Sequence, residues 1–248
     1  MYKFCFAFIT LLAFSSCGIY RQNTVNVPIV QKKGQIQVGS HISFTGYDGQ
    51  ASYTPSDKFT VLANFSAFGV NDGLFHTARH TKEKHNFSEI GIGYYKNKKE
   101  GRTSDIFMLF GNGYTYKFLK GGDTAAGYVK PYEYTKEANY NRFLLQADFI
   151  NKSKKKYFVV SPRLFVLNYY KIKDNATNIF EQNPRTFIYT EGVVTFGVNV
   201  LKDLCISGQA ALTIPITGWS AGYYEFSPLN CSVGLTYNIN FRKNKVDK

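Results

Sequence analysis

Long apolar runs, tryptophan and methionine are scarce in this chain of 248 residues, which contains one Trp and two Met. Its largely apolar run from Phe4 to Phe14 is shorter than the about 20 residues that a helix needs to cross a bilayer. No second hydrophobic span follows it. We therefore do not expect this run to act as an uncleaved helical anchor.

Acidic residues are also few, with 17 Asp and Glu against 30 Lys and Arg, which gives a formal net charge of +13. The lysines gather in short clusters, for example at 96–99, 152–156 and 243–248, and do not follow one helix face. This pattern argues against nucleic-acid binding. It favours solvated turns that lie beside anionic lipid headgroups.

The common catalytic motifs are missing as well. The sequence has no Gly-x-Ser-x-Gly elbow, no Cys-x-x-Cys pair and no His-Glu-x-x-His motif. His41 and Ser43 share one face of an expected strand, but residues two apart in a strand are about 7 Å from each other, too far for a direct hydrogen bond. We expect no catalytic residues, no cofactor and no enzymatic activity, with a lipid-modifying outer-membrane enzyme as the alternative.

The start of the chain has the features of an export signal. Lys3 supplies a positive charge, the apolar run follows, and Ser15-Ser16-Cys17-Gly18 ends the segment. We interpret residues 1–16 as a signal peptide and Cys17 as a lipidation site, although Phe14 replaces the usual aliphatic residue three positions before the cysteine. Ordinary secretory cleavage nearby is the alternative.

From Gln35 onward, apolar and polar residues alternate with period two, which is typical of strands whose two faces meet different surroundings. In the stretch from Leu229 to Phe241, every second residue is apolar, and those between are polar or glycine. This stretch is well beyond the about five or six residues of an average strand. The pattern favours long, membrane-spanning strands over those of a soluble sandwich.

Short and long connections alternate between these expected strands. The short polar turns lie at 55–57, 97–101, 151–155 and 202–203, and the longer connections lie at 71–84, 119–138, 171–183 and 215–228. With a first hairpin that turns near 46–49, this predicts an all-β, up-and-down antiparallel transmembrane β-barrel of about ten strands, with eight as the alternative count. Both barrel termini are then periplasmic.

The first third of the chain resembles a known group of proteins. The relevant residues are Cys17-Gly18, Tyr20, the segment 23–29 (Asn-Thr-Val-Asn-Val-Pro-Ile), the segment 33–39 (Lys-Gly-Gln-Ile-Gln-Val-Gly) and the segment 50–53 (Gln-Ala-Ser-Tyr). Together they resemble the opening of outer-membrane β-barrel lipoproteins from Bacteroidota, a largely uncharacterised family. The resemblance implies a location and a fold, and it brings no catalytic residues.

Charged residues on the expected inward face form the main candidate site. Charges inside a narrow barrel need partners or water, so we expect either a polar network that plugs the lumen, which we favour, or a small aqueous path. The predicted network consists of His41, Glu89, Arg142, Asp148, Arg163 and Glu191.

Two further groups of residues could carry chemistry. His76, His80 and His85 are weak metal candidates, because neighbouring Arg79, Lys82 and Lys84 would repel a cation, and we expect no metal site. Cys205 and Cys231 are expected on opposite faces of neighbouring strands and near opposite ends. Since disulfide-bonded Cα atoms lie within about 7 Å, we expect two free thiols.

These observations predict a signal peptide (1–16), a lipidated tether (17–33), a β-barrel (34–242) and a basic tail (243–248). We expect a monomeric, lipid-anchored outer-membrane protein with a structural or surface-interaction role. Its expected partners are outer-membrane lipid and the machineries for lipoprotein processing and barrel assembly, and the Cys17 lipid is expected near the inner leaflet. The alternatives are a small pore or lipid-modifying barrel enzyme, and a lipid-tethered periplasmic lipocalin-like binding protein.

Overall fold

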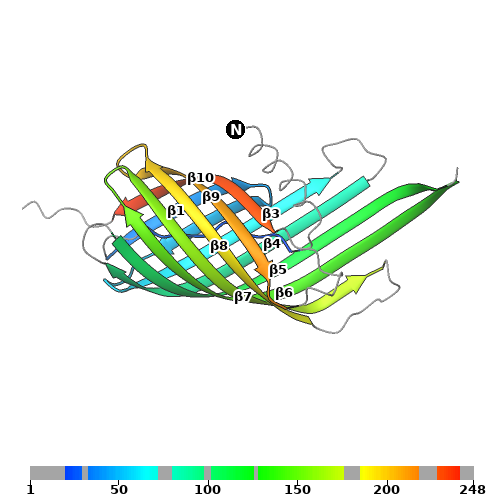
Figure 1. Ribbon diagram of the computed structural model, residues 1–248, viewed down its shortest axis with the longest axis horizontal. Helices are drawn as coiled ribbons and strands as arrows, with labels where there is room; N and C mark the ends of the chain where they lie inside the picture. The colour runs from blue at the N-terminus through cyan, green and yellow to red at the C-terminus, as the bar shows by residue number, and fades with distance from the viewer. Residues whose placement is uncertain are drawn as a thin grey trace, which may run out of the picture.

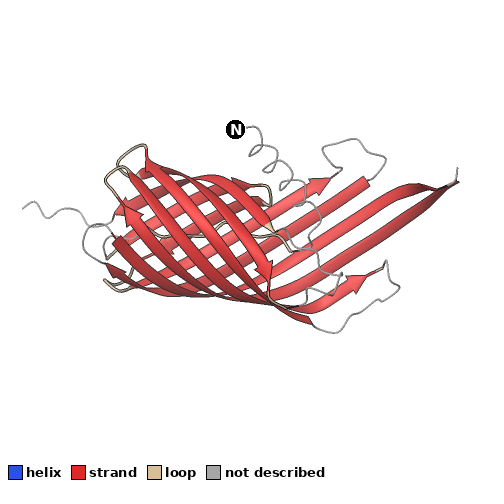
Figure 2. Ribbon diagram, viewed as in Figure 1, coloured by secondary structure: helices blue, strands red, loops and turns tan. Residues whose placement is uncertain are grey.

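A computed structural model of the chain describes residues 20–29, 33–71, 80–97, 102–125, 128–175, 185–217 and 228–240. The signal peptide, Cys17 and the basic tail lie outside these residues. Ten antiparallel strands make up its regular structure (Figure 2). The described part of the chain contains no helix that is long and apolar enough to cross a membrane.

The strands lengthen toward the middle of the chain and then shorten again. Their bounds are β1 Gln35–Ser43, β2 Gly46–Tyr53, β3 Phe59–Asn71, β4 His80–Asn97, β5 Arg102–Ala125, β6 Tyr128–Lys152, β7 Lys156–Asp174, β8 Arg185–Asn199, β9 Leu204–Pro215 and β10 Leu229–Asn240.

Each strand pairs with its neighbours in sequence, and β1 pairs with β10 to close the barrel (Figure 1). At this seam Gln35 lies opposite Asn240 and Ser43 opposite Ser232. The structure confirms the predicted up-and-down antiparallel barrel and its count of ten strands. Closure leaves no sheet edge along the wall, so every strand has a neighbour on both sides.

The two ends of the barrel differ. One end carries the strand ends that border residues 54–58, 98–101, 153–155 and 200–203, together with the start of β1 and the end of β10. We call this the turn end. The other end, which we call the loop end, carries the strand ends that border residues 44–45, 72–79, 126–127, 175–184 and 216–228.

Two expected connections differ from those observed. The first hairpin turns at 44–45 and not at 46–49, because Gly46 already belongs to β2, where its φ of 135° favours glycine. The long connection expected at 119–138 is instead a paired hairpin in which β5 and β6 continue to Ala125 and Tyr128. It projects past the other strands at the loop end (Figure 1).

The polar composition of this hairpin explains why it was expected to be a loop. Among the described residues, β4 pairs with β5 as far as Lys120 and β7 pairs with β6 as far as Lys136, followed by one more hydrogen bond from the Asn175 N–H to the Thr135 carbonyl. Beyond this point the described pairing of the hairpin is between its own two strands. Pro131 lies in this part, where a missing backbone donor does not interrupt a central strand.

The alternation along the strands separates an apolar exterior from a polar interior. Ile42, Ile90, Ile106 and Val233 face outward and are 62%, 61%, 61% and 63% exposed. The residues between the outward positions face the lumen and are mostly polar, as expected from the sequence. The stretch 106–110 is apolar on both faces but still alternates between outward and inward positions, since Phe107 and Leu109 point inward and are buried.

Glycines on the inner wall make room for large rings. Four large inward-facing rings each lie opposite a glycine on the adjacent strand: Phe107 opposite Gly93, Tyr140 opposite Gly113, Tyr157 opposite Gly197 and His41 opposite Gly234. A Cβ atom at any of these glycines would collide with the ring. The rings can therefore lie against the wall and leave space along the barrel axis.

We expect Gly93→Ala to destabilise the barrel by about 1–3 kcal/mol, because the added methyl group would force the Phe107 ring off the wall. The measurement is the temperature at which the folded, fast-migrating form is lost on a gel. Gly192→Ala is the matched control, since a Cβ there meets no atom within 4 Å. Equal loss of stability in the two variants would contradict the steric argument.

Candidate functional site: the occupied lumen

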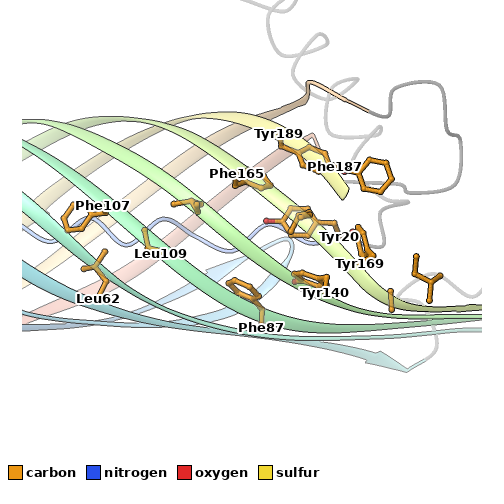
Figure 3. Packing of buried hydrophobic residues seen from close by; sticks show 14 residues of the cluster. Tyr20, Leu62, Phe87, Phe107, Leu109, Tyr140, Phe165, Tyr169, Phe187 and Tyr189 are labelled. Atoms are coloured by element: carbon orange, nitrogen blue, oxygen red, sulfur yellow. The ribbon is translucent and has the colours of Figure 1, made fainter. Parts of the chain in front are cut away.

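Residues 20–29, which we call the lumen segment, run through the inside of the barrel (Figure 3). Tyr20, Val25, Val27 and Ile29 are all buried, at 1%, 1%, 5% and 7% exposure. The expected tether at 17–33 is therefore wrong for this part of the chain. The segment fills the interior and does not span a gap outside the barrel.

The lumen segment alternates as a strand does, although it pairs with no strand over 21–29. Val25, Val27 and Ile29 pack with apolar side chains on the inner wall near the turn end. Thr24 and Asn26 lie on either side of Val25 and make polar contacts. Asn26 donates to Asn64 Oδ1 at 2.8 Å, and Gln50 donates to the Thr24 carbonyl at 3.1 Å.

Glutamine side chains on the wall bind the backbone of the lumen segment. Gln209 accepts from the Val25 N–H at 2.9 Å and donates to the Val25 carbonyl at 2.7 Å. Gln37 accepts from the Ile29 N–H at 2.9 Å and donates to the Val27 carbonyl at 3.2 Å. A buried backbone without these partners would leave donors and acceptors unsatisfied, so the amides replace a neighbouring strand.

The structure places all six residues of the predicted polar network on the inner wall, each at most 5% exposed. It does not join them into one connected network. Instead it pairs some with each other and some with the lumen segment. The partner residues in the segment were missed, because the sequence analysis treated it as a tether.

Arg142 on β6 is the centre of the largest group. Its guanidinium donates to Glu89 Oε2 at 2.6 Å and to the Tyr20 hydroxyl at 2.6 Å. The other oxygen of Glu89 accepts from Asn64 at 2.8 Å and from Asn23 at 3.3 Å. The ion pair is thus embedded in hydrogen bonds, which is the condition under which a buried pair is tolerated.

Of the remaining predicted residues, Arg163 forms a second ion pair, and Asp148 is connected to the Arg142 group through Gln146, Asn26 and Asn64. Arg163 donates to Glu191 at 3.0 Å. Asp148 accepts from Gln146 at 3.1 and 3.0 Å, and the same Gln146 amide donates to the carbonyl of Asn26 at 3.0 Å. His41 is buried, but its Nδ1 has no hydrogen-bond partner among the described residues.

Asp105 is a lumen residue that the sequence analysis missed. It lies directly opposite Asp148 on the neighbouring strand and is 1% exposed. Neither of its carboxylate oxygens has a hydrogen-bond partner within the described ranges. The sequence pattern could have revealed it, because Asp105, Phe107 and Leu109 are alternate residues of one strand and therefore face the same side of the wall.

A cluster of aromatic rings surrounds Tyr20 toward the loop end (Figure 3). The Tyr20 ring centroid lies 5.8 Å from those of Tyr140 and Phe165 and 6.1 Å from that of Tyr189. Arg21, the next residue, pairs with Glu83 and stacks over the Phe68 ring at 3.6 Å. These contacts hold the first residues of the lumen segment to β3, β4, β6, β7 and β8.

Two of the weak histidine candidates, His80 and His85, lie in the same strand. His80 begins β4, and His85 is buried in the same strand with its Nε2 2.7 Å from the Tyr140 hydroxyl. His76 lies outside the described residues. Among the residues that can be described, no group of three His, Cys, Asp or Glu could hold a metal ion.

Neither the two cysteines nor Ser43 has contacts that indicate a reactive group. Cys205 and Cys231 are both free, Cys205 buried on the inner wall and Cys231 half-buried, in agreement with the expected free thiols. The Ser43 hydroxyl lies 2.8 Å from that of Thr45 and donates to the Gly46 carbonyl at 3.1 Å. Within the described ranges the Ser43 hydroxyl therefore bonds to its own turn and makes no hydrogen bond to His41.

No protein-family model matches the chain, and no curated protein matches it. Among solved structures it is similar to the translocator domain of the autotransporter NalP from Neisseria meningitidis (11% identity, 82% of this chain and 86% of that one, TM-score 0.47). It is also similar to Ail, the attachment invasion locus protein of Yersinia pestis (10% identity, 84% of this chain and 100% of that one, TM-score 0.38). A third similar structure is the N-terminal β-barrel domain of Pseudomonas aeruginosa OprF (7% identity, 84% of this chain and 100% of that one, TM-score 0.31).

We expect Gln209→Leu to destabilise the protein by roughly 2 kcal/mol or more, because it leaves the N–H and carbonyl of Val25 buried without partners. Unfolding in denaturant with detergent present measures this loss. The control is the same substitution in a chain that lacks residues 20–29, where the loss should disappear. An equal loss in both backgrounds would show that Gln209 does not act through the lumen segment.

We expect Asp105→Asn to stabilise the barrel by about 0.2–1 kcal/mol, because like charges directly opposite each other on neighbouring strands repel. An amide at this position can also donate to Asp148. The gain should grow as the pH rises and shrink in acid, where both carboxyl groups carry protons. The measurement is the free energy of unfolding of the unaltered chain and of Asp105→Asn between pH 4 and pH 9. A difference in stability that falls with rising pH would contradict the repulsion argument.

Proposed function

We propose that this chain is a lipid-anchored outer-membrane β-barrel with a structural or surface-interaction role, and that its own lumen segment closes its interior. The observation that carries the proposal is the inverted pattern of the barrel. Large apolar side chains cover the outside, and paired charges occupy the inside. Hydrocarbon on the outer surface accounts for both halves of this pattern.

The alternative of a tethered, soluble lipocalin-like protein fits this pattern poorly. A soluble barrel faces water with polar side chains and offers an apolar interior to its ligand. Here Phe44 and Phe65 are 66% and 55% exposed, while Arg142 and Asp148 are 1% and 0% exposed. In water such an exterior would drive aggregation.

The lumen segment argues against an open pore. It lies on the barrel interior from Tyr20 near the loop end to Ile29 near the turn end, and the Arg142 and Glu89 charges that contact it are paired with each other. Water would have to replace hydrogen bonds to Gln37, Gln146 and Gln209 before a path could open. We therefore propose a closed barrel in its resting state.

A surface role is supported by the shape of the loop end. The β5–β6 hairpin extends beyond Lys120 and Lys136, where the described pairings with β4 and β7 end. A strand of such a projecting hairpin can pair with an extended segment of another protein. We propose a monomer that presents this hairpin outside, with lipid and the assembly machineries as its other partners.

The proposal predicts a closed barrel that opens when the lumen segment is removed. The refolded mature chain should migrate differently before and after boiling and should give no steady conductance in planar bilayers. Deletion of residues 20–29 should produce conductance. If that deletion prevents folding, the double variant Gln37→Leu/Gln209→Leu, which weakens four backbone contacts, should show intermittent opening.

Three results would contradict the proposal. Steady conductance of the intact chain would favour the pore, and a monomer that stays soluble without detergent would favour the tethered binder. A change in lipid A mass on overexpression would favour the lipid-modifying enzyme.

A further inference from the structure

The direction of the lumen segment is fixed by contacts at its two ends. At one end, the Tyr20 ring stacks on Tyr189, which pairs with Pro215, the last residue of β9 before the connection 216–228. Arg21 binds Glu83, close to the start of β4. Both contacts lie toward the loop end.

At the other end, Ile29 lies beside the start of β1. Its N–H donates to Gln37 at 2.9 Å, and Gln35 donates to its carbonyl at 3.4 Å. Gln35 pairs with Asn240 at the end of β10 and therefore belongs to the turn end. The chain thus enters the barrel at the loop end, descends through the lumen and turns back into β1.

The length of the segment agrees with a full crossing. Nine residue steps in extended conformation span at most about 30 Å. The apolar band of an outer-membrane barrel is about 25 Å tall. The lumen segment is therefore long enough to run from one face of the membrane to the other, with Tyr20 close to the outer side.

We propose that the mature N-terminus emerges at the loop end, on the cell surface, and that the acyl chains of Cys17 insert into the outer leaflet. This rests on the proposed function, which supplies the membrane, the orientation and the lipid. Cys17 is three residues before Tyr20, so their Cα atoms lie within about 11 Å of each other. That reach is too short to return to the turn end, where the inner leaflet would be.

This inference reverses the leaflet expected from the sequence. That expectation placed Cys17 beside the start of β1 because a tether outside the barrel would begin there. The contacts of Tyr20 and Arg21 instead hold the chain at the opposite mouth. An outer-leaflet lipid would bind the loop end to the membrane surface, next to the projecting hairpin.

Labelling of single cysteines in intact Gram-negative cells tests the proposal. The parent carries Cys205→Ser and Cys231→Ser and keeps Cys17. Three variants of it are compared: Ile19→Cys as the probe, Asn175→Cys at the loop end and Lys154→Cys at the turn end, the last two being exposed positions. A membrane-impermeant maleimide–polyethylene glycol gives a gel shift on each accessible thiol, before and after the outer membrane is permeabilised.

We expect Ile19→Cys and Asn175→Cys to shift in intact cells, and Lys154→Cys to shift only after permeabilisation. If Ile19→Cys reacts only after permeabilisation or only in denaturant, the proposal is overturned while the membrane barrel stands. If Asn175→Cys and Lys154→Cys behave alike in intact cells, the proposed function itself fails. The parent should also incorporate labelled palmitate, and Cys17→Ser should not. If the parent incorporates none, the proposed outer-leaflet lipid is overturned.

Discussion

The pairing of backbone hydrogen bonds between β1 and β10 is the constraint on which the rest of the structure depends. In hydrocarbon an unpaired N–H or carbonyl costs several kcal/mol, so a sheet that spans the membrane has to close. Closure then fixes an interior of limited width, lined by every second residue of ten strands. What occupies that interior follows from this geometry: glycines flatten the large rings against the wall, and the lumen segment fills the axis.

The lumen segment meets the same backbone requirement by different means. A strand in the wall receives its hydrogen bonds from two neighbouring strands, whereas residues 21–29 receive theirs from side chains such as Gln37 and Gln209. Each of these amides both donates and accepts, so each can serve an N–H and a carbonyl of the segment. These hydrogen bonds hold the backbone of the segment in an extended conformation. The apolar wall residues that contact Val25 and Val27 determine which side chains of the segment face that part of the wall.

Much of the fold could be predicted because the environment imposes period two directly on the sequence. Outward residues are largely apolar and inward residues largely polar, so His41, Glu89 and Arg142 could be assigned to the interior without knowledge of their partners. The partners could not be predicted, since a pair such as Arg142 and Glu89 depends on the register between distant residues. The β5–β6 extension was missed because the two strands lose the apolar half of the alternation where they continue beyond their neighbours. The lumen segment was missed although Val25, Val27 and Ile29 alternate in the same way, because it precedes the first hairpin and looked like a linker.

The course of the chain start also restricts the order of assembly. Residues 20–29 lie inside a ring that is complete only when the first strand meets the last. A finished ring could accept the segment only by drawing the chain end, with any bulky group on it, through a passage already lined by Arg142 and the aromatic rings. The sheet therefore has to curl around its own beginning. Residues 20–29 are synthesised before the strands that surround them. Pairing of β10, the last strand, with β1 then encloses the segment.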